Sequence, residues 1–157
     1  YQAVELGAQQ SGCRVMAYWL VKSEPDVFSL DELKSLGAKG SEWTGIRNYQ
    51  ARNNMRAMQI GDKAFFYHSN IGLEIVGIAE VTALVHPDST IDDARWECVD
   101  IKAFCDMPNP VSPDARTATP KLTAMVLVVN TRLSVQPVRE SEWAEICRMG
   151  GLDPAPK

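Results

Sequence analysis

The order and spacing of the apolar segments constrain the fold of this chain most strongly. Aromatic and β-branched residues, which favour strands, gather in short runs that are mostly separated by brief turns. We expect strands at residues 18–23, 63–68, 74–85, 95–104, 124–129 and 133–135. Because strands outnumber helices and follow one another closely, the α+β class with a curled or closed sheet is expected.

Three short helices are expected beside this sheet. Ser29-Leu-Asp-Glu32 has the form of a capping box and predicts a helix that ends at Gly37 or Gly40. Apolar residues at helical spacing predict a second helix over residues 48–59 and a third over residues 140–149. Residues 41–47 and the proline-rich residues 107–119 are expected to form loops.

The length of 157 residues fits one domain. We expect residues 1–15 to be a tag or upstream extension, residues 16–150 to form the domain, and residues 151–157 to be a flexible tail. No apolar run approaches the length that crosses a bilayer, so no membrane partner is expected.

The cysteines and the net charge exclude several classes of function. The four cysteines are scattered, without a C-x-x-C motif or a histidine at ligand spacing. We therefore expect reduced thiols in the cytoplasm, no metal site and no cofactor. The formal net charge of −4 is unlike that of proteins that coat nucleic acid, so any such contact requires a local basic patch.

The stretch Glu42–Asn53 is the most informative part of the sequence, since the common signatures of enzyme sites are missing. Trp43 offers a ring on which a base can stack, and a following helix N-terminus favours an anion. The cations expected to contact phosphates are Arg47, Arg52 and Arg56. In the alternative reading, Trp43 anchors the core and the arginines form a solvated helix face.

Two strand ends carry further polar candidates. Lys22 and Glu24 are two residues apart and point to the same side of a strand end, as a pocket or an exposed ion pair requires. His68, Ser69 and Asn70 place donors and acceptors at the exit of another strand, where the alternative role is to satisfy a turn.

Six ordered segments together resemble the EVE domain family. They are Tyr18–Pro25 (YWLVKSEP), Trp43–Asn53 (WTGIRNYQARN), Gly61–Asn70 (GDKAFFYHSN), Gly77–Glu80, His86–Asp88 and Arg132–Pro137, and the resemblance covers about Ala17–Met149. The resemblance implies a PUA-like mixed β-barrel of about five to six strands flanked by short helices, related to the YTH readers of methylated adenine. It further implies recognition of a modified base, such as methylated cytosine or adenine.

The resemblance also suggests roles for individual residues. Trp43 resembles a wall of an aromatic cage, and the backbone of Thr44 resembles a contact to the base edge. Ser23 and Glu24 resemble strand-end groups that face the same base, and Lys22 and Asn48 are carried over beside them. The loop after Pro87 is shorter than in many members, so Trp96 is expected in the core and not as a second wall.

We therefore expect a monomeric module that binds DNA or RNA carrying a modified base, without catalysis. Replacement of Trp43 by alanine is expected to abolish selective binding and to leave the fold intact. One alternative is an amidohydrolase similar to ASCH domains, in which Lys22 and Glu24 act on a modified nucleoside. A second alternative is a protein-interaction module that no longer binds a ligand.

Overall fold

The computed structural model describes residues 17–24, 26, 28–69, 74–112, 122, 125–126 and 133–152. In chain order, its elements are β1 (Tyr18–Ser23), α2 (Leu30–Ser35), the 3-10 helix η1 (Gly37–Lys39), β2 (Ser41–Glu42), α3 (Tyr49–Ala57), β3 (Lys63–His68), β4 (Glu74–Pro87), β5 (Glu97–Val111), β6 (Val135–Val138) and α6 (Glu140–Met149).

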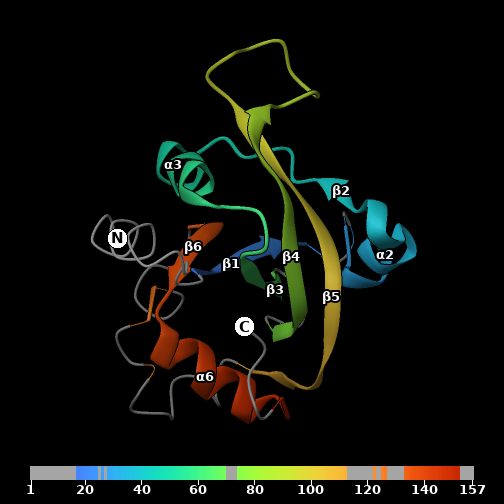
Figure 1. The fold of residues 1–157 in the computed structure, drawn as a ribbon, viewed down its shortest axis with the longest axis vertical. Helices are drawn as coiled ribbons and strands as arrows, with labels where there is room; N and C mark the ends of the chain where they lie inside the picture. The colour runs from blue at the N-terminus through green and yellow to red at the C-terminus, as the bar shows by residue number, and fades with distance from the viewer. Residues whose placement is uncertain are drawn as a thin grey trace.

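The strands form one mixed sheet of six strands in the order β2-β5-β4-β3-β1-β6. β1 and β3 pair in parallel, and the other neighbouring strands are antiparallel. β4 and β5 make a long curved hairpin whose connecting loop projects from one end of the molecule (Figure 1). The expected closure into a barrel is wrong for the described part of the chain, because the sheet ends at the two-residue strand β2 and at β6.

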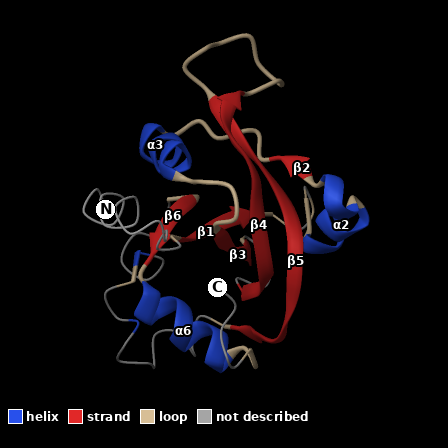
Figure 2. Cartoon of the chain, in the orientation of Figure 1, coloured by secondary structure: helices blue, strands red, loops and turns tan. Residues whose placement is uncertain are grey.

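Both faces of the sheet are covered, so its central strands alternate between two cores. On one face Trp19 and Phe66 pack with apolar residues of α2 and α3. On the opposite face Leu20 and Phe65 pack with Trp143 of α6, and the rings of Phe65 and Trp143 stack with centroids 4.1 Å apart. In Figure 2, α6 lies at the lower end of the molecule, away from α3.

The helix signals in the sequence are confirmed. Ser29 Oγ accepts a hydrogen bond from Glu32 N at 3.2 Å, and Glu32 Oε1 accepts one from Ser29 N at 3.3 Å, which completes the capping box. α3 and α6 lie where apolar spacing predicted them. None of the described helices combines the length and the apolar character needed to cross a bilayer.

The long hairpin departs from the sequence prediction at both of its strands. β4 continues to Pro87, and β5 passes Pro108 and Pro110, where a loop was expected. β2 pairs only with Asp100 and Ile101, so the described part of β5 beyond them is paired with β4 alone. Prolines are tolerated where a strand lacks a second paired neighbour.

Some predictions fall outside the described residues. These are the upstream segment 1–15, most of the tail 151–157 and Asn70. Of the strand expected at residues 124–129, only 125 and 126 are described, and neither is in a strand.

Candidate functional site

A cavity of about 540 Å³ lies where the end of β1 meets β2 and the loop that follows β2. Five predicted pocket residues line it, namely Lys22, Ser23, Glu24, Trp43 and Thr44. The sequence analysis missed six others, which are Phe28, Ser41, Glu42, Gly45, Ile46 and Ser134. The volume falls within the range of roughly 300–1,000 Å³ that is typical of small-molecule sites.

Trp43 is both a core residue and a wall of this cavity. Its side chain is only 6% exposed. Its ring meets Phe66 edge-on with centroids 5.5 Å apart, and it meets Phe28 edge-on at 6.1 Å. Its backbone N donates to Val99 O at 2.7 Å. These contacts fix the ring, so the two readings of Trp43, core anchor and pocket wall, both apply.

The polar end of β1 is also held in place. Ser23 Oγ donates to Phe28 O at 2.5 Å, and Phe28 N donates to Glu24 O at 2.9 Å, which closes a turn at the cavity. Lys22 N donates to Ser134 O at 3.0 Å, and Lys22 Nζ lies 5.5 Å from the centre of the Tyr67 ring. The exposed Glu24 thus stands beside a rigid strand end.

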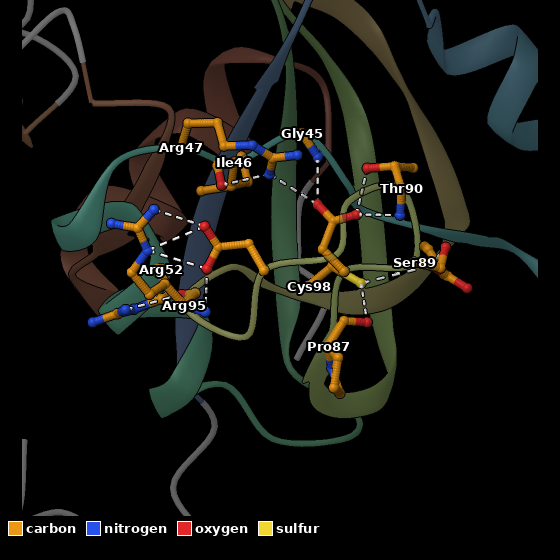
Figure 3. A network of polar contacts seen from close by, with 12 residues as sticks. Gly45, Ile46, Arg47, Arg52, Pro87, Ser89, Thr90, Arg95 and Cys98 are labelled. Carbon is orange, nitrogen blue, oxygen red and sulfur yellow. Dashed lines mark hydrogen bonds and ion pairs between the residues drawn. The ribbon is translucent and has the colours of Figure 1, made fainter.

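A buried aspartate that the sequence analysis did not single out holds the loop after β2. Asp88 Oδ2 accepts from Gly45 N and from Arg47 Nη1, each at 3.0 Å. Asp88 Oδ1 accepts from the backbone N and the hydroxyl of Thr90. Figure 3 shows Gly45, Arg47 and Thr90 directed toward this carboxylate. Gly45 has a φ of 85°, a conformation that favours glycine.

The pKa of Asp88 reflects the same contacts. Burial alone would raise the pKa of this carboxyl, but hydrogen bonds from Thr90, Gly45 and Arg47 hold it well below its usual range. Asp88 therefore remains ionised and ties the cavity loop to the tip of the β4–β5 hairpin. The only sequence signal was its place in the segment His86–Asp88, which carried the family resemblance but suggested no role.

Three predicted pocket residues do not line the cavity. Asn48 Oδ1 accepts from Ala51 N at 2.9 Å and caps α3. His68 Nε2 accepts from Leu30 N at 3.2 Å at the start of α2, and burial lowers the pKa of this histidine. Ser69 N donates to Ser23 O at 2.9 Å. Asn48 Oδ1 and His68 Nε2 are therefore engaged by backbone N–H groups, and none of the three residues is part of the cavity lining.

Two of the three predicted phosphate-binding arginines lie on a neighbouring surface with two aromatic rings. We call Arg47, Tyr49, Arg52, Arg95 and Trp96 the arginine–aromatic surface. The half-exposed Tyr49 ring stacks on Trp96 with centroids 5.0 Å apart, and the Arg52 guanidinium lies 4.8 Å from the centre of the Tyr49 ring. Arg47 lies 5.8 Å from the centre of the Trp96 ring. The burial of Trp96 agrees with its predicted place in the core, outside the cavity lining.

Two of the arginines have protein partners of different kinds. Arg52 Nη1 donates to the backbone carbonyl oxygen of Arg95 at 2.9 Å. Because this oxygen carries no formal charge, the contact does not neutralise the Arg52 guanidinium. Arg56 Nε pairs with Glu97 Oε1 at 2.5 Å. Because Glu97 neutralises its charge, Arg56 is not retained as a phosphate contact.

Comparisons with known proteins identify relatives of the whole domain. The family model of the EVE domain matches residues 17–149. Thymocyte nuclear protein 1 of Mus musculus is 34% identical over an alignment of 180 positions. The alignment includes 94% of this chain and 79% of the mouse protein. A crystal structure of a protein from Agrobacterium tumefaciens is 61% identical with a TM-score of 0.86, covering 90% of this chain and 99% of that one.

A crystal structure of the human THYN1 protein in complex with 5-methylcytosine-containing DNA is 30% identical with a TM-score of 0.81. The match covers 88% of this chain and 99% of the human one. A YTH domain from Zygosaccharomyces rouxii, 16% identical with a TM-score of 0.53, shares the fold alone, which supports the PUA-like class. With a family model over residues 17–149 and full-domain relatives above 30% identity, the chain belongs to the EVE domain family.

Proposed function

We propose that this chain binds a nucleic acid and receives one modified base in the cavity beside Trp43, without catalysing a reaction. The observation that carries the proposal is the cavity itself. It joins the strand end and the loop from which the sequence predicted the base contacts. The human relative solved with 5-methylcytosine-containing DNA supports this class of ligand.

The cavity offers both an aromatic wall and polar groups to a flipped or single-stranded base. Stacking of a base on an aromatic side chain contributes roughly 1–3 kcal/mol, which offsets most of the cost of extruding that base. Glu24, Thr44 and Ser23 then face the edge of the base. Burying one methyl group adds only about 0.8 kcal/mol, or a factor of about four, so stronger discrimination requires shape exclusion.

Filling the cavity should remove base recognition. Ser134 lines the cavity, so Ser134→Phe introduces a ring into the space proposed for the base. We expect binding of an oligonucleotide with one 5-methylcytosine to weaken at least about tenfold, the equivalent of losing one stacked base. Calorimetry with DNA and RNA oligonucleotides, modified and unmodified, measures the loss.

The matched control is Ser141→Phe, which puts the same ring on the exposed side of α6, away from the cavity. It should bind like the wild type. Unchanged binding by Ser134→Phe would exclude this cavity as the base site.

The arginine–aromatic surface should supply a contact to the nucleic-acid backbone through Arg52, because Arg47 is already paired with the Asp88 carboxylate. Arg52→Gln is expected to weaken binding to modified and unmodified strands alike and to lower the salt dependence by about one ion. Titrations at several salt concentrations measure this slope. Arg148→Gln on α6 removes the same charge elsewhere and should leave the slope unchanged; equal slopes in wild type and Arg52→Gln would refute the phosphate contact.

One structural observation favours an alternative function, the hydrolysis of an acylated nucleoside. Lys22 and Glu24, the two residues that could act in such a reaction, line the same cavity. Incubation with N4-acetylcytidine separates the two functions. The binding proposal predicts no release of acetate, whereas release that is lost in Lys22→Met would favour the enzyme.

A further inference from the structure

Three neighbouring strands bring four metal-ligating side chains to one place beside the cavity. In the β4–β5 pairing, His86 lies directly opposite Cys98. Asp100 follows Cys98 by two residues and therefore points to the same side of β5. In the β2–β5 pairing, Glu42 lies directly opposite Asp100. The strand register alone thus gathers an imidazole, a thiol and two carboxylates.

The distances in this group suit a tetrahedral metal ion. One ligand atom each from His86, Cys98 and Asp100 lies within 4.8 Å of the other two. His86 Nε2 and Asp100 Oδ1 are 2.7 Å apart, and Cys98 Sγ lies 3.8 Å from His86 Nε2. Zinc bonds of about 2.0–2.3 Å separate tetrahedral ligand atoms by roughly 3.3–3.8 Å. The contact between His86 Nε2 and Asp100 Oδ1 has to open for an ion to enter, because 2.7 Å is shorter than this separation.

The surroundings of the thiol also favour a cation. Cys98 is buried, and its Sγ lies 3.8 Å from Glu42 Oε1 and 3.9 Å from Pro87 O. Figure 3 shows Cys98 beside Pro87 at the edge of the Asp88 network. An oxygen of the Asp100 carboxylate lies within 4.8 Å of the same sulfur. Excess negative charge around a buried thiol is relieved by a divalent cation.

We propose that His86, Cys98 and Asp100 form a Zn²⁺ site, with Glu42 next to its fourth position. An imidazole and a thiolate select zinc over magnesium, which prefers oxygen ligands. The thiol loses its proton to solvent when the Zn–S bond forms, so no oxidant or reductant is needed. His86 and Asp100 are each about one-third exposed, which gives the ion a route from solvent.

The proposed zinc site cannot be recognised from the spacing of its ligands along the sequence. His86 is twelve residues from Cys98 and belongs to another strand, so no ligand motif appears along the chain. The proposed zinc site does not depend on base binding in the cavity. Glu42 is common to both places, because it lies next to the zinc ligands and also lines the cavity. An ion near Glu42 would hold that wall of the cavity in one position.

Titration of the whole, reduced and chelator-treated protein with Co²⁺ tests the proposal. We expect one equivalent to bind and to produce a thiolate-to-cobalt charge-transfer absorption, which Zn²⁺ then displaces and Mg²⁺ does not. Cys98→Ser should abolish the absorption, and His86→Ala should weaken cobalt binding while sparing the thiol.

The matched control is Cys105→Ser, which removes a half-buried thiol from the same strand outside the group. It should retain the full absorption. The proposal is overturned if the wild type gives no such absorption, if the absorption persists in Cys98→Ser, or if it disappears in Cys105→Ser. Circular dichroism of each variant separates ligand loss from misfolding.

Discussion

Replacement of Trp43 by alanine is expected to lower the free energy of unfolding by about 3–5 kcal/mol, as for other buried aromatic residues. The side chain is 6% exposed and packs edge-on against Phe66 and Phe28 within the core. Urea denaturation measures the loss. The sequence analysis expected the fold to stay intact and treated the ring as a free-standing platform. The burial of the ring adds the prediction that the variant, although folded, is less stable.

The same substitution should also weaken binding to a 5-methylcytosine oligonucleotide by about 5- to 150-fold, the equivalent of 1–3 kcal/mol of stacking. Stability and binding have to be separated, and Trp143→Ala provides the comparison. Trp143 is also buried but lies in the core on the opposite face of the sheet, stacked on Phe65.

Measured at a temperature where both variants are folded, Trp143→Ala should bind like the wild type. If both variants lose affinity equally, general destabilisation explains the effect and Trp43 is no base platform. Trp43→Phe keeps an aromatic ring and should fall between the wild type and Trp43→Ala.

Asp88→Asn should lower the free energy of unfolding by about 2–4 kcal/mol, because hydrogen bonds to a buried charged group contribute about 1.5–3 kcal/mol each. The carboxylate accepts from Gly45, Arg47 and twice from Thr90. The asparagine side chain has only one acceptor oxygen. Its NH₂ group would therefore face either the donors of Gly45 and Arg47 or those of Thr90, and these hydrogen bonds would be lost. Thermal unfolding and urea denaturation both measure this loss.

The pH dependence provides a second test of Asp88. Its pKa is lowered in the folded protein, so its contribution to stability is present above its ordinary pKa of about 4. That contribution is lost as the pH falls below this value toward the lower folded pKa. The wild type should lose stability there, and Asp88→Asn should show less of this loss.

The control is Asp92→Asn, which changes an exposed acid in the same hairpin loop and should unfold like the wild type. A normal unfolding free energy for Asp88→Asn would mean that the network does not stabilise the loop. In that case the loop after β2 would owe its shape to the burial of Trp43 and Ile46.

The parts of the fold that depend on local chemistry were predictable from the sequence. The capping box at Ser29 and the apolar spacing of α3 and α6 depend on residues a few positions apart, so sequence alone locates them. Trp43 and the end of β1 were also identified, through their residue types and the family resemblance. Trp43 and the end of β1 line the same cavity.

Features that depend on strand register were not predictable. The position of His86 opposite Cys98 follows from pairing across the hairpin, and spacing along the chain does not encode it. The contact of Asp88 with Gly45 likewise joins two segments that are far apart in the sequence. His68 shows the reverse error. Its position at a strand exit suggested a ligand contact, but the folded chain places a backbone N–H of α2 against its ring nitrogen.

The most direct test of base binding beside Trp43 is an NMR titration that follows the tryptophan indole N–H signals. Trp43→Phe and Trp143→Phe assign two of the four tryptophan signals. On addition of a short oligonucleotide with one 5-methylcytosine, we predict a large shift of the Trp43 indole N–H signal and no shift of the Trp143 signal. A saturated complex in which the Trp43 signal stays in place would contradict it.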